Sequence, residues 1–229
     1  MGSDLSVVNA ARVSFGKNSL GECIEYDIFR DDPDVIKAAV AHYKSAGFVV
    51  TSDVDDWKVV ITRPLMGDTK LIKYLAKHKH ISPFGHAFAS FHVKAPIFVA
   101  RQLVKHKFLR WNEISRRYVD DEPEFYVPDV WRGRSADKKQ GSEGAVKLGT
   151  LDDAIVSDSP HEALCAYNSL LDAGVAPEQA RMVLPQSTMT EWYWSGSLDA
   201  FADMCRLRCK GDTQYESRVV ADQVSTIMQ

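Results

Sequence analysis

The spacing of apolar residues changes several times along the first third of the chain, and each change marks a boundary between predicted elements. Behind Asp4, which favours the first position of a helix, apolar residues recur at helical spacing until Ser14 and Gly16. Residues 31–47 predict a second helix, with Pro33 in its first turn. β-branched and aromatic side chains predict strands over residues 23–29, 48–52 and 57–64.

The middle of the chain predicts a helix, an irregular segment, a strand and a central helix, in that order. The first helix covers residues 69–79, and Pro83 and Gly85 disfavour its continuation. Residues 87–95 favour a strand, and Pro96 suits the first position of the central helix.

The central helix is expected to present two stripes. Its apolar stripe contains Ile97, Ala100 and Val104, and its polar stripe contains Gln102, Lys105 and His106. Because the apolar stripe fixes the helix on the core, the polar stripe is available to a ligand.

The remainder of the chain predicts mainly helices. Residues 122–131 are expected to be extended, and residues 132–145 to form a mobile loop, because they are polar and lack apolar periodicity. Helices are expected over residues 158–173 and 177–184, and a last helix from Leu198 toward the C-terminus. Core positions rather than a stacking platform are expected for Trp192, Tyr193 and Trp194.

Length and composition limit the possible classes of protein. A chain of 229 residues with 45% hydrophobic side chains can bury a core of one or at most two domains. The net charge of −3 argues against a nucleic-acid or membrane partner, so anion binding must be local. The first residues lack a secretory pattern and no apolar run approaches the roughly 20 residues of a membrane span, which predicts a cytoplasmic protein. The four cysteines are scattered and are expected to be free thiols.

Positively charged side chains are concentrated between Ala95 and Tyr118. Cations there and further along the chain are Arg101, Lys105, Lys107, Arg110, Arg116, Arg117, Arg181, Arg206 and Arg208. A basic run of this kind is also typical of a solvated helix face, but converging arginines and lysines would bind phosphate. His80, His86 and His92 recur every six residues, which matches no zinc spacing, so no metal is expected. Phosphate-binding glycine loops and the nucleophile elbow are absent from the sequence.

Several ordered motifs resemble one family, the flavin-dependent thymidylate synthases. They are NAARVSF, HISPFGH, VKAPIFVARQ, FYVP, ARMVLP, the RLR of the last helix, and KHK with seven residues to Ser115 inside NEISRRY. The family's hallmark is Arg-His-Arg, seven residues and Ser, which stands here as Lys105, His106, Lys107 and Ser115. The resemblance covers residues 4–15 and 68–220 and leaves residues 16–67 as an insertion.

The resemblance implies an α/β fold of the α+β type, with a helical layer on a mixed sheet. It implies a single domain over residues 1–229, with the insertion as a small αβ unit, assembled as a homotetramer. The implied enzyme is an FAD-dependent methyltransferase of nucleotide biosynthesis. It would convert dUMP to dTMP with methylenetetrahydrofolate as carbon donor, NADPH as reductant and FAD as hydride carrier.

The resemblance also implies roles for individual residues. The flavin would be contacted by Ser14, His80, Ser82, Lys105, His106, Lys107 and Glu113. The deoxynucleotide would be held by Gln102, Ser115, Arg117, Arg181 and Arg208. Of these, Arg208 and Ser115 would act on the reacting pyrimidine, Arg208 by stabilising negative charge on a carbonyl and Ser115 by positioning the ring.

The sequence departs from the family mostly on the flavin side. Lysines replace both hallmark arginines, and Gly85 stands where the family usually has glutamate. Further differences, where the family often has asparagine, asparagine and histidine, are Ser197, Asp203 and Asp212. These departures keep alternatives open: a hydroxymethylase acting on dUMP or dCMP, or a non-catalytic nucleotide-binding or RNA-binding protein.

Overall fold

The computed structural model describes residues 4–15, 17, 22–27, 37–38, 41, 49–53, 58–63, 66–119, 121–136 and 141–228. The chain divides into two compact units. Unit 1 contains residues 1–89 and 197–199, and unit 2 contains residues 90–196 and 200–229.

The helical part of unit 1 consists of α1 (Asp4–Arg12), η1 (Val13–Phe15), α3 (Met66–Lys77) and η2 (Ser82–His86). Val7, Leu75 and Ala87 form its buried cluster, because α1 and α3 turn their apolar stripes toward each other. An ion pair of 2.7 Å between Arg12 and the buried Asp68 also joins the two helices. The two helices predicted here are confirmed, with α3 shifted by two or three residues.

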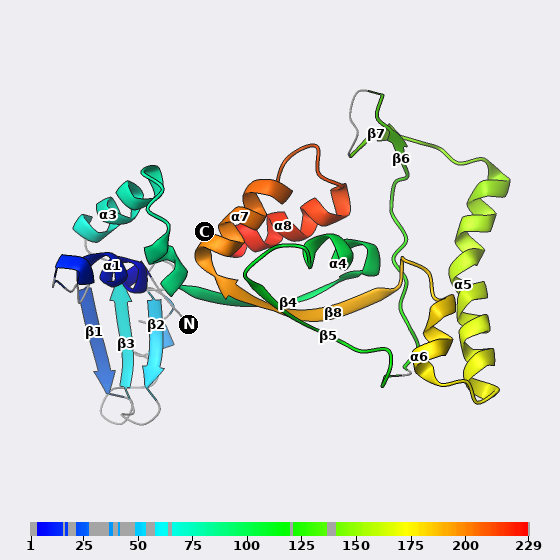
Figure 1. The fold of residues 1–229 in the computed structure, drawn as a ribbon, viewed down its shortest axis with the longest axis horizontal. Coiled ribbons are helices and arrows are strands. Elements are labelled where there is room, and N and C mark those ends of the chain that lie inside the picture. The colour runs from blue at the N-terminus through cyan, green and yellow to red at the C-terminus, as the bar shows by residue number, and fades with distance from the viewer. Residues whose placement is uncertain are drawn as a thin grey trace. The chain divides into compact units, whose positions relative to one another are not determined.

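The strands of unit 1 form one antiparallel sheet in the order β1-β3-β2 (Figure 1). The strands are β1 (Glu22–Asp27), β2 (Val49–Asp53) and β3 (Lys58–Arg63), which confirms the predicted strands to within two residues. Of the helix predicted over residues 31–47, only residues 37, 38 and 41 are described, and they are helical. The assignment of residues 16–67 as an insertion stays a prediction.

Unit 2 is built on the sheet β4-β8-β5, formed by β4 (Phe88–Pro96), β8 (Met189–Ser197) and β5 (Leu109–Glu113). Helices α4 (Ile97–Leu103), α7 (Leu198–Arg208) and α8 (Tyr215–Ile227) lie together over one face of it (Figure 1). This helical layer on a sheet confirms the predicted fold class, and the pairing of β5 with β8 is antiparallel.

Side chains of β8 alternate between the core and solvent, as expected of a strand with one covered face. Trp192 and Trp194 are fully buried, whereas Tyr193 between them is exposed. Trp192 stacks on Trp111 with ring centroids 4.3 Å apart, and Trp194 meets Phe201 of α7 edge-on at 5.4 Å. The core prediction is therefore confirmed for both tryptophans and is wrong for the tyrosine.

The remaining elements of unit 2 are β6 (Arg132–Arg134), β7 (Ser142–Ala145), α5 (Thr150–Asp172), α6 (Pro177–Ala180) and η3 (Arg181–Val183). The predicted mobile loop is thus wrong at both ends, where β6 and β7 pair as an antiparallel hairpin. Helix α5 begins eight residues earlier than predicted, because Asp152 and Asp153 favour its first turn and Pro160 is accommodated inside it.

Two further helix predictions are corrected by the structure. The central helix ends at Leu103, with Pro96 as its N-cap, because Phe108 has a left-handed φ of 65° and the chain turns there into β5. Val104 is exposed rather than part of the buried stripe. The predicted last helix is two helices, α7 and α8, separated by residues 209–214. Within the described ranges, no helix is both long and apolar enough to cross a bilayer.

Candidate active site

Three segments of unit 2 meet at Arg208, the last residue of α7. Its Nε donates to Nε2 of His106 at 3.0 Å, and its Nη2 donates to the backbone carbonyl of Gln102 at 3.3 Å. Gln102 lies in the last turn of α4 and His106 in the turn that follows. The structure therefore brings together residues from the two sets that the resemblance distinguished, the flavin set and the nucleotide set.

The imidazole of His106 is held neutral by its surroundings. Partial burial lowers the pKa of His106, and the nearby positive charge of Arg208 lowers it further. Because Nε2 accepts a hydrogen bond, the ring proton lies on Nδ1. His106 thus orients the guanidinium as an acceptor, and the positive charge of the cluster stays on Arg208.

A pocket of about 460 Å³ opens beside this cluster. Its lining consists of Gln102, Gly141, Leu207, Arg208, Lys210, Asp212, Thr213 and Gln214. Two cations and several hydrogen-bonding side chains make it suited to a polar, anionic ligand.

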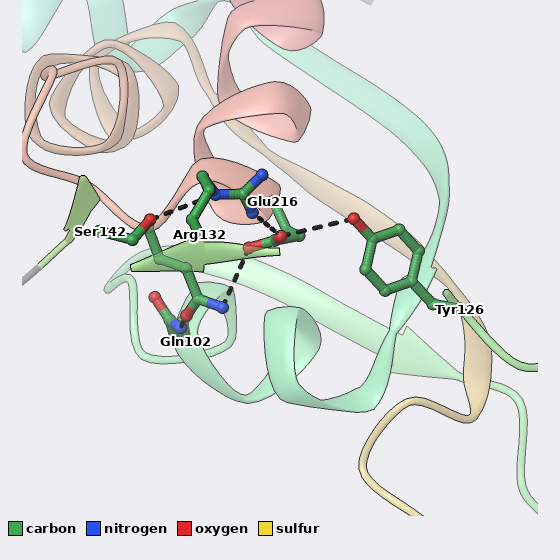
Figure 2. Close-up of polar contacts among 6 residues, drawn as sticks. Gln102, Tyr126, Arg132, Ser142 and Glu216 are labelled. Carbon is green, nitrogen blue, oxygen red and sulfur yellow. Dashed lines mark hydrogen bonds and ion pairs between the residues drawn. The ribbon is translucent and has the colours of Figure 1, made fainter. Parts of the chain in front are cut away.

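The amide of Gln102 is fixed by contacts with the start of α8. Ser217 donates its hydroxyl to Oε1 of Gln102 at 3.1 Å, and Nε2 of Gln102 donates to Oε1 of Gln214. Gln214 in turn donates to Glu216 at 3.1 Å. Figure 2 shows the carboxylate of Glu216 between Arg132 and Tyr126, both of which bind it.

A second pocket, of about 420 Å³, is lined in part by Glu216 and shares Gly141 and Gln214 with the first. It is more aromatic, with Phe98, Tyr126 and Trp131 among its lining residues. Arg132 of β6 donates its Nε to Ser142 of β7 at 3.2 Å within the hairpin, and its ion pair with Glu216 connects the hairpin to this region (Figure 2).

The end of β5 carries a further group of predicted site residues. Both the backbone N–H and Nε of Arg117 donate to the hydroxyl oxygen of Ser115, each at 3.3 Å. Glu113 accepts hydrogen bonds from Thr190 at 2.7 Å and from Trp111 at 2.9 Å, which ties the end of β5 to β8.

The other predicted site residues do not contact the Arg208 cluster in the described part of the chain. Arg181 is exposed in η3 and donates to the carbonyl of Glu178 at 3.2 Å. Lys105 and Lys107 are exposed on either side of His106. Three residues belong to unit 1, where all of them are exposed: Ser14, His80 and Ser82.

The histidines and cysteines were the other candidates for chemistry in the sequence. Among the described residues, no group of three His, Cys, Asp or Glu side chains is placed to hold a metal ion. Cys165, Cys205 and Cys209 are free thiols. His92 binds Glu191 at 3.0 Å and stacks on Tyr193, so it takes part in a surface cluster of the sheet.

Sequence reasoning missed four residues between α7 and α8 and in the first turn of α8. Thr213 and Gln214 line the pocket. Glu216 accepts from the side-chain amide of Gln214, and Ser217 donates to that of Gln102. The signal that could have found them is Gly211 followed by Asp212 and Thr213, a cluster that favours a break in a helix. A loop at this point, directly after the RLR motif, would have been expected to face the same ligand.

Comparison with known proteins identifies the family. A family model described as "Thymidylate synthase complementing protein" (Thy1) matches residues 1–229. A flavin-dependent thymidylate synthase of Thermus thermophilus is 42% identical over 170 residues, which are 73% of this chain and 62% of that protein. The chain thus spans about three fifths of that relative's length. A flavin-dependent thymidylate synthase of Kosmotoga olearia is 34% identical over 229 residues, covering 99% of this chain and 81% of the relative.

A solved structure is similar over nearly the whole chain. It is the UMP/dUMP methylase PolB from Streptomyces cacaoi, bound with 5-Br dUMP, with a TM-score of 0.67 and 29% sequence identity. The match covers 99% of this chain and 86% of that one. Sequence motifs, fold and family model agree, and the chain belongs to the thymidylate synthase complementing protein family, whose relatives named above are flavin-dependent thymidylate synthases.

Proposed function

We propose that this protein is a flavin-dependent thymidylate synthase that converts dUMP to dTMP, with methylenetetrahydrofolate as carbon donor, NADPH as reductant and FAD as cofactor. The observation that carries the proposal is the contact of Arg208 with His106 and Gln102 at the mouth of a polar pocket. Membership of the family and the dUMP analogue in the similar PolB structure support the choice of substrate.

Arg208 is the residue proposed to act on the pyrimidine. Two of its N–H groups are used inside the protein, by His106 and by the carbonyl of Gln102, so the remaining ones can face a ligand. A guanidinium held in this way stabilises the negative charge that develops on a pyrimidine carbonyl when C5 becomes nucleophilic. Because the arginine is fixed before the ligand arrives, little reorganisation is needed during the reaction.

Ser115 is proposed to position the nucleotide rather than to attack it. Its oxygen already accepts two hydrogen bonds from Arg117, and a guanidinium cannot accept the proton of a nucleophilic hydroxyl. The hydroxyl can therefore donate to the substrate, and the Arg117 guanidinium beside it can bind a phosphate oxygen. Arg181, exposed in η3, is proposed to complete the phosphate site.

The residues that the resemblance assigns to the flavin carry groups that suit it. Exposed hydroxyl and imidazole groups of Ser14, His80 and Ser82 can bind flavin oxygens and nitrogens, and the exposed ammonium groups of Lys105 and Lys107 suit a pyrophosphate. These groups suit FAD, and so do the imidazole of His106 and the carboxylate of Glu113, which can accept a hydrogen bond from the cofactor. A flavin bound by these residues, once reduced by NADPH, would supply the hydride that completes the methyl group.

We further propose that the enzyme is a homotetramer whose sites are completed by neighbouring subunits. A large apolar side chain follows each of four predicted site residues and is largely exposed: Phe15 80%, Phe108 84%, Tyr118 75% and Met182 79%. Such side chains beside polar site residues are typical of surfaces that another molecule covers. The cytoplasmic location predicted from the sequence remains part of this proposal.

The test of the proposal is spectroscopic and chemical. Purified protein should show the paired absorption bands of oxidised flavin, and incubation with dUMP, methylenetetrahydrofolate and NADPH should give the mass of dTMP. A colourless protein that gains no bands when FAD is added would contradict the proposed function.

A second candidate is suggested by the name of the PolB methylase, which includes UMP as well as dUMP. The same assay with UMP in place of dUMP distinguishes the two substrates. A product heavier than dTMP by one oxygen atom would instead identify a hydroxymethylase, an alternative favoured by the lysines and glycine on the flavin side.

A further inference from the structure

We propose that Glu216 sets the direction of a hydrogen-bond relay that orients the side-chain amide of Gln102, so that Gln102 offers an N–H donor to an oxygen atom of the nucleotide. Glu216 would then be a positioning residue, acting through Gln214 and not by touching the substrate. The inference rests on the proposed function only for the identity of the ligand.

The relay runs from the β6–β7 hairpin to α4 through the start of α8 (Figure 2). Arg132 binds one carboxylate oxygen of Glu216, and Gln214 donates its Nε2 to the other at 3.1 Å. Oε1 of Gln214 then accepts from Nε2 of Gln102. The far end is closed by Ser217, which donates to Oε1 of Gln102.

The carboxylate decides which way each amide points. An ionised glutamate can only accept hydrogen bonds, so Gln214 must turn its NH₂ group toward Glu216 and its carbonyl oxygen toward Gln102. Gln102 must therefore turn its NH₂ group toward Gln214 and its carbonyl oxygen toward Ser217. The negative charge of Glu216 thus fixes which way the side-chain amides of Gln214 and Gln102 point.

The carboxylate of Glu216 is held in place by its own contacts. Its side chain is 11% exposed and that of Arg132 is 23% exposed, so the ion pair is shielded from solvent. The guanidinium of Arg132 also lies over the ring of Tyr215, 4.2 Å from its centroid. Because Tyr215 and Glu216 both hold Arg132, its guanidinium stays bound to Oε1 of Glu216. Oε2 of Glu216 is then left to accept from Gln214.

The relay leaves one N–H of Gln102 for a ligand, because none of the described residues accepts it. Gln102 and Arg208 line the same pocket, and the free groups of both are donors. The ligand atom that fits between them is an acceptor oxygen, from the pyrimidine, the sugar or the phosphate.

Substitution of the carboxylate by an amide should reverse the relay. In Glu216→Gln the new carbonyl oxygen faces Arg132, which can only donate, so the new NH₂ group faces Gln214. Both glutamines then turn over, and Gln102 presents a lone pair where it offered an N–H. We expect dUMP to bind about tenfold more weakly or worse, with KM raised more than kcat is lowered.

A charge swap provides the rescue. In the double variant Glu216→Gln with Gln214→Glu, the carboxylate moves one place along the relay but still accepts from Gln102, so the original direction returns. The ion pair with Arg132 does not return, so rescue separates relay direction from the ion pair. Tyr126→Phe is the matched control, because it removes only a 3.4 Å hydrogen bond to Glu216 and leaves the direction unchanged.

The affinities of the wild type and of each variant for dUMP and for deoxyuridine are measured by calorimetric titration. Weak binding by Glu216→Gln, recovery in the swap and a change within about twofold in Tyr126→Phe are expected. A loss seen with dUMP but not with deoxyuridine locates the oxygen on the phosphate. Should the single variant fail to fold, the swap still decides: binding as in the wild type supports the relay. Because Gln214→Glu adds a negative charge to the lining of the pocket, the swap is judged with uncharged deoxyuridine. A folded swap that binds deoxyuridine tenfold more weakly than the wild type does, or a single variant that binds dUMP normally, overturns it. A wild-type protein that binds no dUMP overturns the proposed function itself.

Discussion

Arg208 and His106 are joined by a hydrogen bond of 3.0 Å from Nε of the arginine to Nε2 of the imidazole. The contact exists only while the imidazole is neutral, since a protonated ring has no acceptor to offer. Acid should therefore disturb the guanidinium that we propose to act on the pyrimidine.

The pH dependence of stability follows from the lowered pKa of His106, caused first by burial and then by Arg208. Below its unfolded pKa of about 6.5 the unfolded chain binds the proton more readily than the folded one. The contribution of His106 is thus complete above pH 6.5 and is lost as the pH falls through the lower, folded value. Thermal unfolding of the wild type between neutral and acid pH should show this loss.

His106→Gln is the matched variant for this prediction, because its amide oxygen can accept from Arg208 but does not titrate. We expect a shallower decline of the melting temperature in acid than in the wild type. An identical acid slope in both proteins would show that His106 is not the group responsible.

Arg208→Ala should lower kcat by about 100-fold or more while the fold is kept, because it removes a fixed donor from the transition state. Arg206→Ala, on the same helix, is the control. The side chain of Arg206 is exposed and, among the described residues, pairs only with the exposed Asp203, a contact worth less than about 1 kcal/mol. Steady-state assays with circular dichroism as a fold check would measure both. Equal activities in the two variants would contradict the role of Arg208.

The thiols of Cys205 in α7 and of Cys209 directly after it should be dispensable. Burial raises the pKa of Cys205, and burial with the neighbouring Asp222 raises the pKa of Cys209 to about 12, so neither is a thiolate at neutral pH. Cys205→Ala and Cys209→Ala are each expected to keep turnover within about twofold, and iodoacetamide should label the exposed Cys165 before them. Loss of turnover in either variant would require a mechanism with an enzyme thiolate.

Local patterns predicted β1 to β4 as strands, because strand periodicity is a local property, whereas β5 and β8 were not predicted as strands. Aromatic character placed Trp192 and Trp194 in the core, correctly, and Tyr193 with them, wrongly, and β4 was found from its aromatic and β-branched residues. The same reasoning extended the central helix beyond Leu103. There the pairing of β5 with β8 overrides a helical pattern, which only long-range contacts reveal.

The candidate site could be predicted only from the order of motifs. Gln102 and Arg208 lie 106 residues apart, and no periodicity links them. The family resemblance predicted both as nucleotide contacts, whereas Gln214 and Glu216 were missed because α7 and α8 were read as one helix. Their roles depend on donor and acceptor directions between side chains, which the sequence does not encode locally.

Gly196 should be sensitive to substitution, because it lies opposite Leu109, where β8 meets β5. A Cβ atom there would stand 2.5 Å from Cδ2 of Leu109 and 2.9 Å from the carbonyl oxygen of Phe108. The leucine side chain can move, but the carbonyl belongs to the left-handed turn at Phe108 and cannot. Gly196→Ala is expected to lower the free energy of unfolding by about 1–3 kcal/mol.

The Gly196→Ala substitution should also disturb the candidate active site, because the turn that it displaces carries Lys105, His106 and Lys107. Gly211→Ala is the control, because a Cβ there meets nothing within 4 Å and should change stability by less than about 0.5 kcal/mol. Urea denaturation of both variants measures the difference. If the added methyl group pushes β5 away from β8, Gly196→Ala should also lose part of the pH-dependent stability assigned to His106. A Gly196→Ala variant as stable as the wild type would mean that the two strands tolerate a wider separation.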